Sequence, residues 1–484
     1  MTAVRNASVA PLLASQVPRW DDEADVVVVG FGAAGSSAAW EAATAGASVL
    51  VLERAGAAGG AAAMSDGMVY LGGGTSTQRA AGFADSVENM RTFLTAACGP
   101  APDAAKIDVY CERSVEHHDW LLARGVRFLG TYLPEGGGTS PLDGEGLLFT
   151  GGENAAPFDE LVPPAPRAHA TQGARPGGSA LMAALSAAAL ETGARVEFDT
   201  RADRLVVDDQ QRVVGVVASR YGDDRVIRAR TGVVLTAGGF INNPEMVEQY
   251  APVLQLTALR LGTDGDDGRG IRMAQAVGAR VKRMDAVECA LPFNAPRGLK
   301  YGILVNRLGQ RFVNEDTYMG RVGQRALVKE LGEVYLVVDE AHYAPNWLGI
   351  AATWVCESAA ELETEIGLPA GSLVGTIDYF NSHAAHGEDP LFGKRKPTLE
   401  PLVPPLAAFD LRATKFIYAP FTLGGLHTTV DGEVLDLDGS PIPGLYAAGR
   451  TTSGVAAQGY CSGVSLGDST LFGRLAGRAA AGVK

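Results

Sequence analysis

Apolar and polar positions first form a regular pattern between Asp25 and Ala55. Four consecutive valines, Val26 to Val29, are followed by a glycine-rich turn, a helix-length run of small residues and a second apolar run that ends at Glu53. Apolar runs of strand length on either side of a helix are typical of parallel strands joined by a crossover. The pattern therefore predicts a complete βαβ unit.

The glycines of that turn have the spacing of a dinucleotide-binding loop. Gly30 would permit a tight turn, Gly32 would let the backbone approach a pyrophosphate, and Gly35 would let helix and strand pack closely. The helix N-terminus would face the phosphate charge, and Glu53 would accept a hydrogen bond from a ribose hydroxyl. The alternative is a plain turn in an ordinary α/β sheet, but the surrounding strand, helix, strand and acid favour nucleotide binding.

The next patterns alternate between helix and loop. Residues 101–124 have helical periodicity, and we expect their His117-His118 pair to lie on a solvated helix edge rather than in a ligand site. Residues 131–178 are rich in glycine and proline, and their leucines and phenylalanines favour a cover over an apolar site over a disordered segment. Residues 181–191 predict an alanine-rich helix.

Alternating apolar strands are predicted between Ala194 and Gly239. Beyond them, the acidic cluster of residues 264–268 is expected to begin a helix whose acidic first turn suits the helix dipole. This cluster lacks the closing acid of a calcium loop, so we expect no metal there. Residues 301–313 read as strand, turn and strand.

Composition narrows the class of protein. The 484 residues suggest about two to three domains. The net charge of −14 argues against a nucleic-acid partner and against binding to an anionic membrane. The five cysteines are scattered without a CxxC pair, which is typical of a reduced, cytoplasmic protein without a disulfide framework. No apolar run is long enough for a transmembrane segment, and residues 1–20 read as a surface tail rather than a signal peptide.

Six motifs in order resemble one family. They are the βαβ unit, the Gly59-Gly60 loop, TAGGF at 236–240, TDGDDGRGIRMA at 263–274, GQRFVNED at 309–316 and PGLYAAGR at 443–450. Together they are similar to the fumarate reductase/3-ketosteroid dehydrogenase superfamily of FAD enzymes, along nearly the whole chain. The resemblance implies an α/β fold: a Rossmann-like, discontinuous FAD-binding domain (1–258 and 419–484) with an inserted α+β substrate, or capping, domain (259–418).

The cofactor implied by the resemblance is FAD. Some relatives have a histidine in the early glycine-rich loop, but the first histidine here is His117, so we expect the FAD to be non-covalent. The residues expected to bind it are Gly30, Gly32, Ala33, Ala34, Gly35, Glu53, Arg54, Gly59, Gly60, Ala61, Ser65, Asp66, Gly67, Ala237, Gly238, Gly449, Arg450, Gly463, Val464, Ser465 and Leu466.

The catalytic residues implied by the resemblance are two tyrosines and a serine. Fumarate reductases have a proton-donating arginine soon after their NE motif, where this chain has Tyr318, with Arg321 a little further on. The C-terminal stretch adds Tyr460 and Ser462. Phenols and a hydroxyl suit a neutral ketone better than a dicarboxylate. Because Δ1-dehydrogenases have glycine where Ser462 stands, the sequence looks like the 3-ketosteroid Δ4-(5α)-dehydrogenases.

The implied reaction introduces a C4–C5 double bond into a 3-keto-5α-steroid. Tyr460 is predicted as the base at C4, Ser462 as its hydrogen-bond partner or relay, and Tyr318 as a group that positions the substrate or shares the role of base. A backbone amide near Gly463 or Val464 would polarise the ketone. Alternatives are a Δ1-dehydrogenase, a fumarate-reductase-like enzyme, or a non-catalytic flavin electron carrier. The sequence does not identify the electron acceptor.

Overall fold

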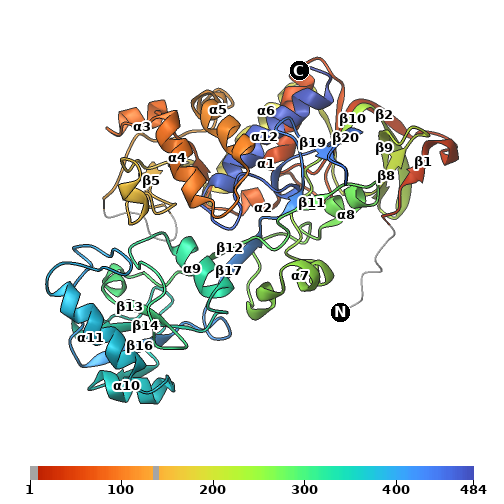
Figure 1. Cartoon of the computed structure of the whole chain (residues 1–484). Helices are drawn as coiled ribbons and strands as arrows, with labels where there is room; N and C mark the ends of the chain where they lie inside the picture. The colour runs from red at the N-terminus through yellow and green to blue at the C-terminus, as the bar shows by residue number, and fades with distance from the viewer. Residues whose placement is uncertain (1–8, 135–140, 484) are drawn as a thin grey trace.

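A nine-stranded sheet forms the centre of the larger part of the molecule in the computed structural model, which describes residues 9–134 and 141–483 (Figure 1). The strands are β1 (Leu12–Leu13), β2 (Asp22–Val29), β3 (Val49–Leu52), β7 (Arg195–Glu197), β8 (Thr200–Val207), β9 (Val213–Arg220), β10 (Asp223–Leu235), β19 (Glu433–Leu435) and β20 (Pro441–Ala447). The order is β1-β8-β9-β10-β2-β3-β7, with β20 also on β10 and β19 on β20. Strands β7, β3, β2, β10 and β20 run parallel, while β8 and β9 form an antiparallel excursion.

The valine run lies in the middle of this sheet. Val26 and Val28 pack into one buried cluster and Val27 and Val29 into another, so both faces of β2 are covered. One face carries α1 (Ala33–Thr44), α6 (Gly177–Glu191) and α12 (Val464–Ala480), and α12 lies along α1 (Figure 1). Strand β2, helix α1 and strand β3 are the predicted βαβ unit, which is confirmed.

Helices and a three-stranded sheet cover the outer side of α12. They are α2 (Gly60–Ala63), α3 (Ser76–Ala80), α4 (Val87–Ala97), α5 (Ala104–Leu122), β4 (Met68–Tyr70), β5 (Leu147–Leu148) and β6 (Ala168–Ala170). The histidine pair on α5 is fully buried, not solvated, because His117 bonds to Thr470 of α12 and His118 to Thr77 of α3.

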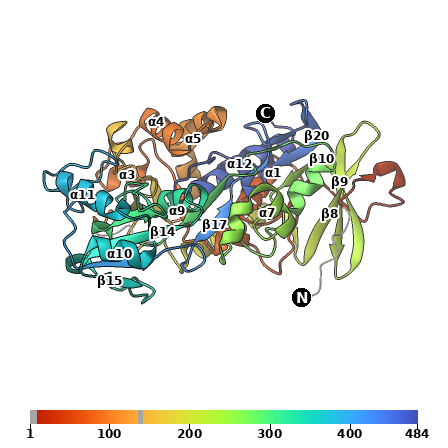
Figure 2. The same ribbon diagram turned by 60° about the horizontal axis from the view of Figure 1, so that its bottom comes forward.

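The inserted segment forms a second sheet at the other end of the molecule (Figure 2). Its antiparallel strands are β13 (Ile303–Asn306), β14 (Val334–Asp339), β16 (Leu406–Asp410) and β15 (Trp354–Cys356), accompanied by α9 (Met319–Val328), α10 (Ala359–Ile366) and α11 (Ser372–Ala384). The predicted second strand after β13 is only an isolated bridge at Arg311. The Arg311 side chain instead enters buried ion pairs with Glu315 and Asp389, which fix the loop that leads to Tyr318.

Short antiparallel pairs connect the two parts. They are β11 (Val281–Lys282) with β18 (Gly425–Leu426) and β12 (Val287–Ala290) with β17 (Ala419–Thr422), next to helices α7 (Pro244–Tyr250) and α8 (Arg269–Gln275). This arrangement agrees with the predicted Rossmann-like α/β fold carrying an α+β insertion. Within residues 9–134 and 141–483, no helix combines the length and the hydropathy needed to cross a bilayer.

Candidate active site

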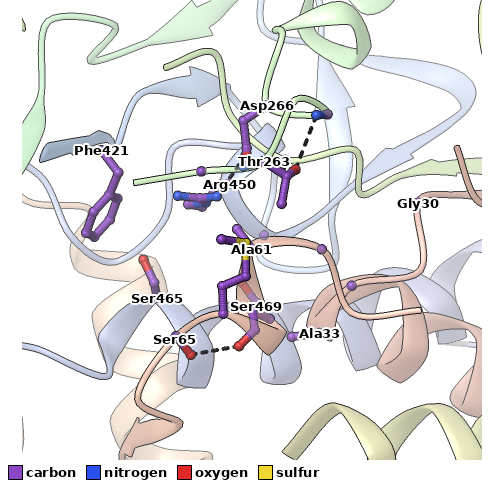
Figure 3. Close-up of a pocket in the computed structure, with 18 of the residues that line it drawn as sticks. Gly30, Ala33, Ala61, Ser65, Thr263, Asp266, Phe421, Arg450, Ser465 and Ser469 are labelled. Carbon is purple, nitrogen blue, oxygen red and sulfur yellow. Dashed lines mark hydrogen bonds and ion pairs between the residues drawn. The ribbon is translucent and has the colours of Figure 1, made fainter. Parts of the chain in front are cut away.

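A cavity of about 570 Å³ lies where the main sheet, the connecting strands and the start of α12 meet. Segments from three distant parts of the sequence line it, as Figure 3 shows for Gly30 and Ser65, for Thr263, and for Ser465. A cavity of this size is within the ordinary range for a cofactor site.

The glycine turn forms one wall of the cavity. At Gly30, φ is +100° and an added Cβ would lie 2.6 Å from the carbonyl oxygen of Thr236. A Cβ at Gly35 would lie 2.0 Å from the Gly30 oxygen, so this glycine is needed for packing rather than for ligand contact. Gly32 precedes α1, and the nearest atom to its added Cβ is 3.7 Å away. The open approach at Gly32 and the helix N-terminus behind it fit a pyrophosphate.

Glu53 lies at the end of β3 on the same wall. Its two carboxylate oxygens accept hydrogen bonds of 2.7 Å from the amides of Phe31 and Ala55. A carboxylate offers about four acceptor positions, so two remain for ribose hydroxyls. The buried glutamate is thus held in place by the turn that would hold the phosphates.

Most predicted cofactor residues line the cavity. The lining residues are Gly30, Gly32, Ala33, Ala34, Glu53, Arg54, Gly59, Gly60, Ala61, Ser65, Asp66, Gly67, Ala237, Gly238, Gly449, Arg450, Gly463, Ser465 and Leu466. Gly35 and Val464 are not among them. Gly35 acts through packing, and the Val464 amide donates to the carbonyl of Cys461 at 3.0 Å.

The acidic cluster has a different role from the predicted one. Helix α8 begins only at Arg269, so the aspartates lie before its first turn. Asp266 instead pairs with Arg450 at 2.7 Å (Figure 3), and Asp267 pairs with Arg54 at 3.0 Å. The aspartates therefore balance arginines of the cavity wall.

The described residues of the glycine- and proline-rich segment 131–178 do not form the predicted cover over this cavity. Residues 135–140 lie outside the described part of the chain, and none of the segment's described residues lines the cavity. Leu147, Leu148 and Phe158 are buried in the body of the protein. The described part of the predicted lid thus belongs to the packed core, because β6 pairs with β4 and β5 pairs with β6.

One end of the cavity, which we call the catalytic end, brings the predicted catalytic residues together. It is lined by Glu288, Ala290, Tyr318, Met319, Ala419, Phe421, Tyr460 and Ser462. Tyr318 directly precedes α9, and Tyr460 and Ser462 lie in the short segment before α12, which begins at Val464. Phe421 of β17 packs edge-to-face against Tyr460, with ring centroids 5.3 Å apart.

The two tyrosines have perturbed acidities. Burial raises the pKa of Tyr460 to about 12, and hydrogen bonding from Ser465 acts in the opposite direction. The Ser465 amide, in the first turn of α12, donates to the Tyr460 oxygen at 3.3 Å. Burial, followed by the nearby Glu288 charge, raises the pKa of Tyr318 well above its usual range, while hydrogen bonding with Ser462 lowers it.

Glu288 was not predicted from the sequence. It lies on β12, is 2% exposed, and accepts a hydrogen bond from the Tyr318 hydroxyl at 3.4 Å. Burial raises the pKa of Glu288 to about 8, and the charge of Arg321 offsets part of that rise. The local sequence holds one indication of a functional role for Glu288, because an acidic residue stands inside the otherwise apolar strand β12.

Other lining residues were also missed. Thr200, Arg201 and Ala202 line the cavity from β8, a strand that the sequence pattern describes only as alternating. They reach the site because the Thr200 amide bonds to the Glu53 carbonyl at 2.8 Å.

Comparisons with known proteins show the family of the chain. The sequence model of the FAD binding domain family matches residues 25–466. The chain is similar to the crystal structure of 3-ketosteroid-Δ4-(5α)-dehydrogenase from Rhodococcus jostii RHA1 in complex with 4-androstene-3,17-dione, with 49% identity, a TM-score of 0.93, and coverage of 98% of this chain and 100% of that chain.

Two curated relatives extend the comparison. The 3-oxo-5-alpha-steroid 4-dehydrogenase of Comamonas testosteroni is 29% identical, over 89% of this chain and 93% of its own. The 3-oxosteroid 1-dehydrogenase of Mycolicibacterium smegmatis is 30% identical, over 94% of this chain and 96% of its own. The chain therefore belongs to the FAD binding domain family, within the fumarate reductase/3-ketosteroid dehydrogenase superfamily of flavoproteins, and its cofactor is FAD.

Proposed function

We propose that this protein is an FAD-dependent 3-ketosteroid Δ4-(5α)-dehydrogenase, which introduces a C4–C5 double bond into 3-keto-5α-steroids. The observation that carries the proposal is the convergence of two phenols from distant parts of the chain, Tyr318 and Tyr460, on the catalytic end of the flavin cavity. The 49% identity to a dehydrogenase of this specificity supports the same assignment.

The chemistry requires loss of a proton from C4 and of a hydride from C5. When bound, FAD supplies the hydride acceptor, N5 of its ring system. Tyr460 takes the C4 proton, Ser462 bonds to it or relays its proton, and Tyr318 positions the substrate or shares the role of base. The Ser465 amide stabilises the phenolate form of Tyr460, the form that can take up a proton, because it already donates to that oxygen.

The ketone is polarised by a backbone amide at the start of α12. Of the two predicted donors, Gly463 is the stronger candidate, because it lines the cavity and the Val464 amide is already bonded to Cys461. An amide fixed at a helix N-terminus is suited to an oxygen that gains negative charge.

The catalytic end suits an apolar ketone rather than a dicarboxylate. Ala290, Met319, Ala419 and Phe421 provide an apolar surface, and none of the described residues of the catalytic end is an arginine or lysine. Arg321, the cation nearest in sequence to Tyr318, donates to the carbonyls of Ala97 and Gly151. Reduction of a dianion would require cations to bind it.

A direct test is anaerobic reduction of the yellow holoprotein. A saturated 5α-3-ketosteroid should bleach the flavin absorbance, whereas succinate, a 4-ene-3-ketone and buffer alone should not. Bleaching by succinate would favour a fumarate-reductase-like enzyme, and bleaching by the 4-ene-3-ketone would favour a Δ1-dehydrogenase. No bleaching by any of these compounds would favour an electron carrier and refute the proposal.

The remaining predictions belong to the same proposal. Residues 1–258 and 419–484 form the FAD-binding domain and residues 259–418 the cap. The FAD is held without a covalent bond, the protein is cytoplasmic, and a separate electron acceptor reoxidises the flavin. The burial of all five cysteines as free thiols supports the reduced compartment.

A further inference from the structure

The carboxyl group of Glu288 has no role in the mechanism described so far. One oxygen, Oε1, accepts the hydrogen bond from Tyr318 at 3.4 Å. The other, Oε2, is buried and has no hydrogen-bond partner among residues 9–134 and 141–483. A buried, half-satisfied carboxyl group is costly to keep, which points to a use.

The contact between Glu288 and Tyr318 depends on a glycine. A Cβ at Gly320, in the first turn of α9, would lie 2.2 Å from Oε1 of Glu288 and 2.3 Å from Cε1 of Tyr318. Any side chain at this position would therefore push the phenol and the carboxyl group apart. The local structure keeps an acid next to the phenol at the catalytic end.

The groups around Glu288 set its charge. On α9, Arg321 is the cation that favours the carboxylate. Tyr318 and Tyr460 face Glu288 from the segments before α9 and α12. The neighbouring thiols are Cys461, next to Tyr460, and Cys289, which follows Glu288 on β12. The residue opposite on β17 is the uncharged Phe421. With burial outweighing one cation, the pKa of about 8 is close to neutral pH.

A phenol needs such a neighbour to act as a base. The pKa of Tyr460 is about 12, so almost all of it is protonated at neutral pH. A protonated phenol can accept a second proton only if it passes its own proton on during the same event. Tyr318 has an acceptor in place for that transfer, Oε1 of Glu288.

We propose that Glu288 is the proton acceptor behind the two tyrosines: the C4 proton taken up by Tyr318 and Tyr460 leaves through the Tyr318 hydroxyl onto Oε1. The proposal rests on the function proposed above. The C4–H bond breaks and its electron pair forms the C4–C5 double bond as the C5 hydride departs to FAD. The C4 proton forms a new O–H bond on Tyr460, whose own phenol proton passes, directly or through Ser462, to the Tyr318 oxygen. As that bond forms, the original Tyr318 O–H bond breaks and its proton forms a new O–H bond on Oε1 of Glu288. The resulting carboxylic acid returns its proton to water between turnovers.

The test is the rate of anaerobic flavin reduction by a saturated 5α-3-ketosteroid, measured on holoenzyme by stopped flow from pH 6 to pH 10. Only the carboxylate can accept a proton, so the wild-type rate should rise about tenfold per pH unit below pH 8 and level off above it. Glu288→Gln should abolish this rise and lower the plateau rate about 100-fold, with bound FAD unchanged. Glu288→Asp should restore the pH dependence at a reduced rate.

Glu153→Gln is the matched control. Glu153 is also buried and also accepts from a tyrosine, Tyr70 at 2.7 Å, but it does not line the cavity. This variant should retain the pH dependence. A rate independent of pH in the wild type, or the same rise in Glu288→Gln, overturns this inference alone. A flavin that no steroid reduces overturns the proposed function and this inference with it. If Glu288→Gln does not fold, the inference is still tested by the pH dependence of the reduction rate in the wild type and in Glu288→Asp.

Discussion

Helices α1 and α12 pack backbone against backbone beside the cofactor site, and adding one methyl group tests this contact. A Cβ at Gly477 of α12 would lie 2.3 Å from the Ala38 carbonyl oxygen and 2.8 Å from the Ala38 Cα, both backbone atoms of α1. Ordinary contacts begin near about 3.5 Å, so the two helices would have to separate by about 1 Å. The N-terminus of α1 would move with the helix, away from its place beside the cavity.

The expected cost can be worked out from this clash. Overpacking of a core costs about 1–3 kcal/mol, and two helix backbones cannot yield as a flexible side chain can, so the upper end applies. Replacing glycine by alanine within a helix stabilises the folded protein by about 1 kcal/mol, because alanine has the higher helix propensity. Gly477→Ala should therefore lower the stability by about 2 kcal/mol and weaken FAD binding.

Gly375 provides the matched control. It lies within α11, is exposed, and no atom comes within 4 Å of its added Cβ. Gly375→Ala should raise stability by about 1 kcal/mol, the opposite sign for the same chemical change. Thermal unfolding followed by flavin fluorescence, with FAD content after gel filtration, measures both effects. A Gly477→Ala protein that keeps its FAD and unfolds at or above the wild-type midpoint would refute the packing argument.

Three further changes probe the site and its support. Tyr460→Phe should keep bound FAD but lower steroid turnover about 10²–10⁴-fold, as measured by steady-state assay; near-normal turnover would remove this phenol from the mechanism. Glu53→Gln should weaken FAD binding about tenfold to a hundredfold in a fluorescence titration of apoprotein, because a hydrogen bond to a charged group contributes about 1.5–3 kcal/mol; unchanged affinity would mean that Glu53 does not contact the ribose. Asp85→Asn should destabilise the protein by about 3–5 kcal/mol in urea unfolding, because it leaves the fully buried Arg167 without its ion pair of 2.7 Å; a smaller loss would indicate that water reaches Arg167.

The parts of the fold that could be predicted from sequence are those set by local spacing. The valine run, the glycine turn and Glu53 lie within about one βαβ unit, so their relation in space follows from the geometry of a strand and a helix. Tyr318 and Tyr460 are far apart in sequence, and only the family resemblance brought them together. The cavity lining supports that pairing.

The features that were missed depend on tertiary contacts. Glu288 enters the site because β12 pairs with β17 and because Gly320 leaves room for the carboxyl group, and neither fact can be read from the residues around it. The buried His117 was mistaken for a surface residue, because its partner Thr470 is 353 positions further along the chain. Helical periodicity gives the face of a helix but does not say whether a second helix covers it.

The closure of the sheet by β20 and α12 has a consequence for the growing protein on the ribosome. At synthesis rates of about 5–20 residues per second, roughly 20–90 s separate the appearance of β2 from that of α12. During this interval α1 lacks its neighbour α12, and once β10 has been made, one of its edges lacks β20. We therefore expect chaperones to bind the exposed apolar surfaces of the nascent chain, and the complete lining of the FAD cavity to exist only after the start of α12 has been synthesised.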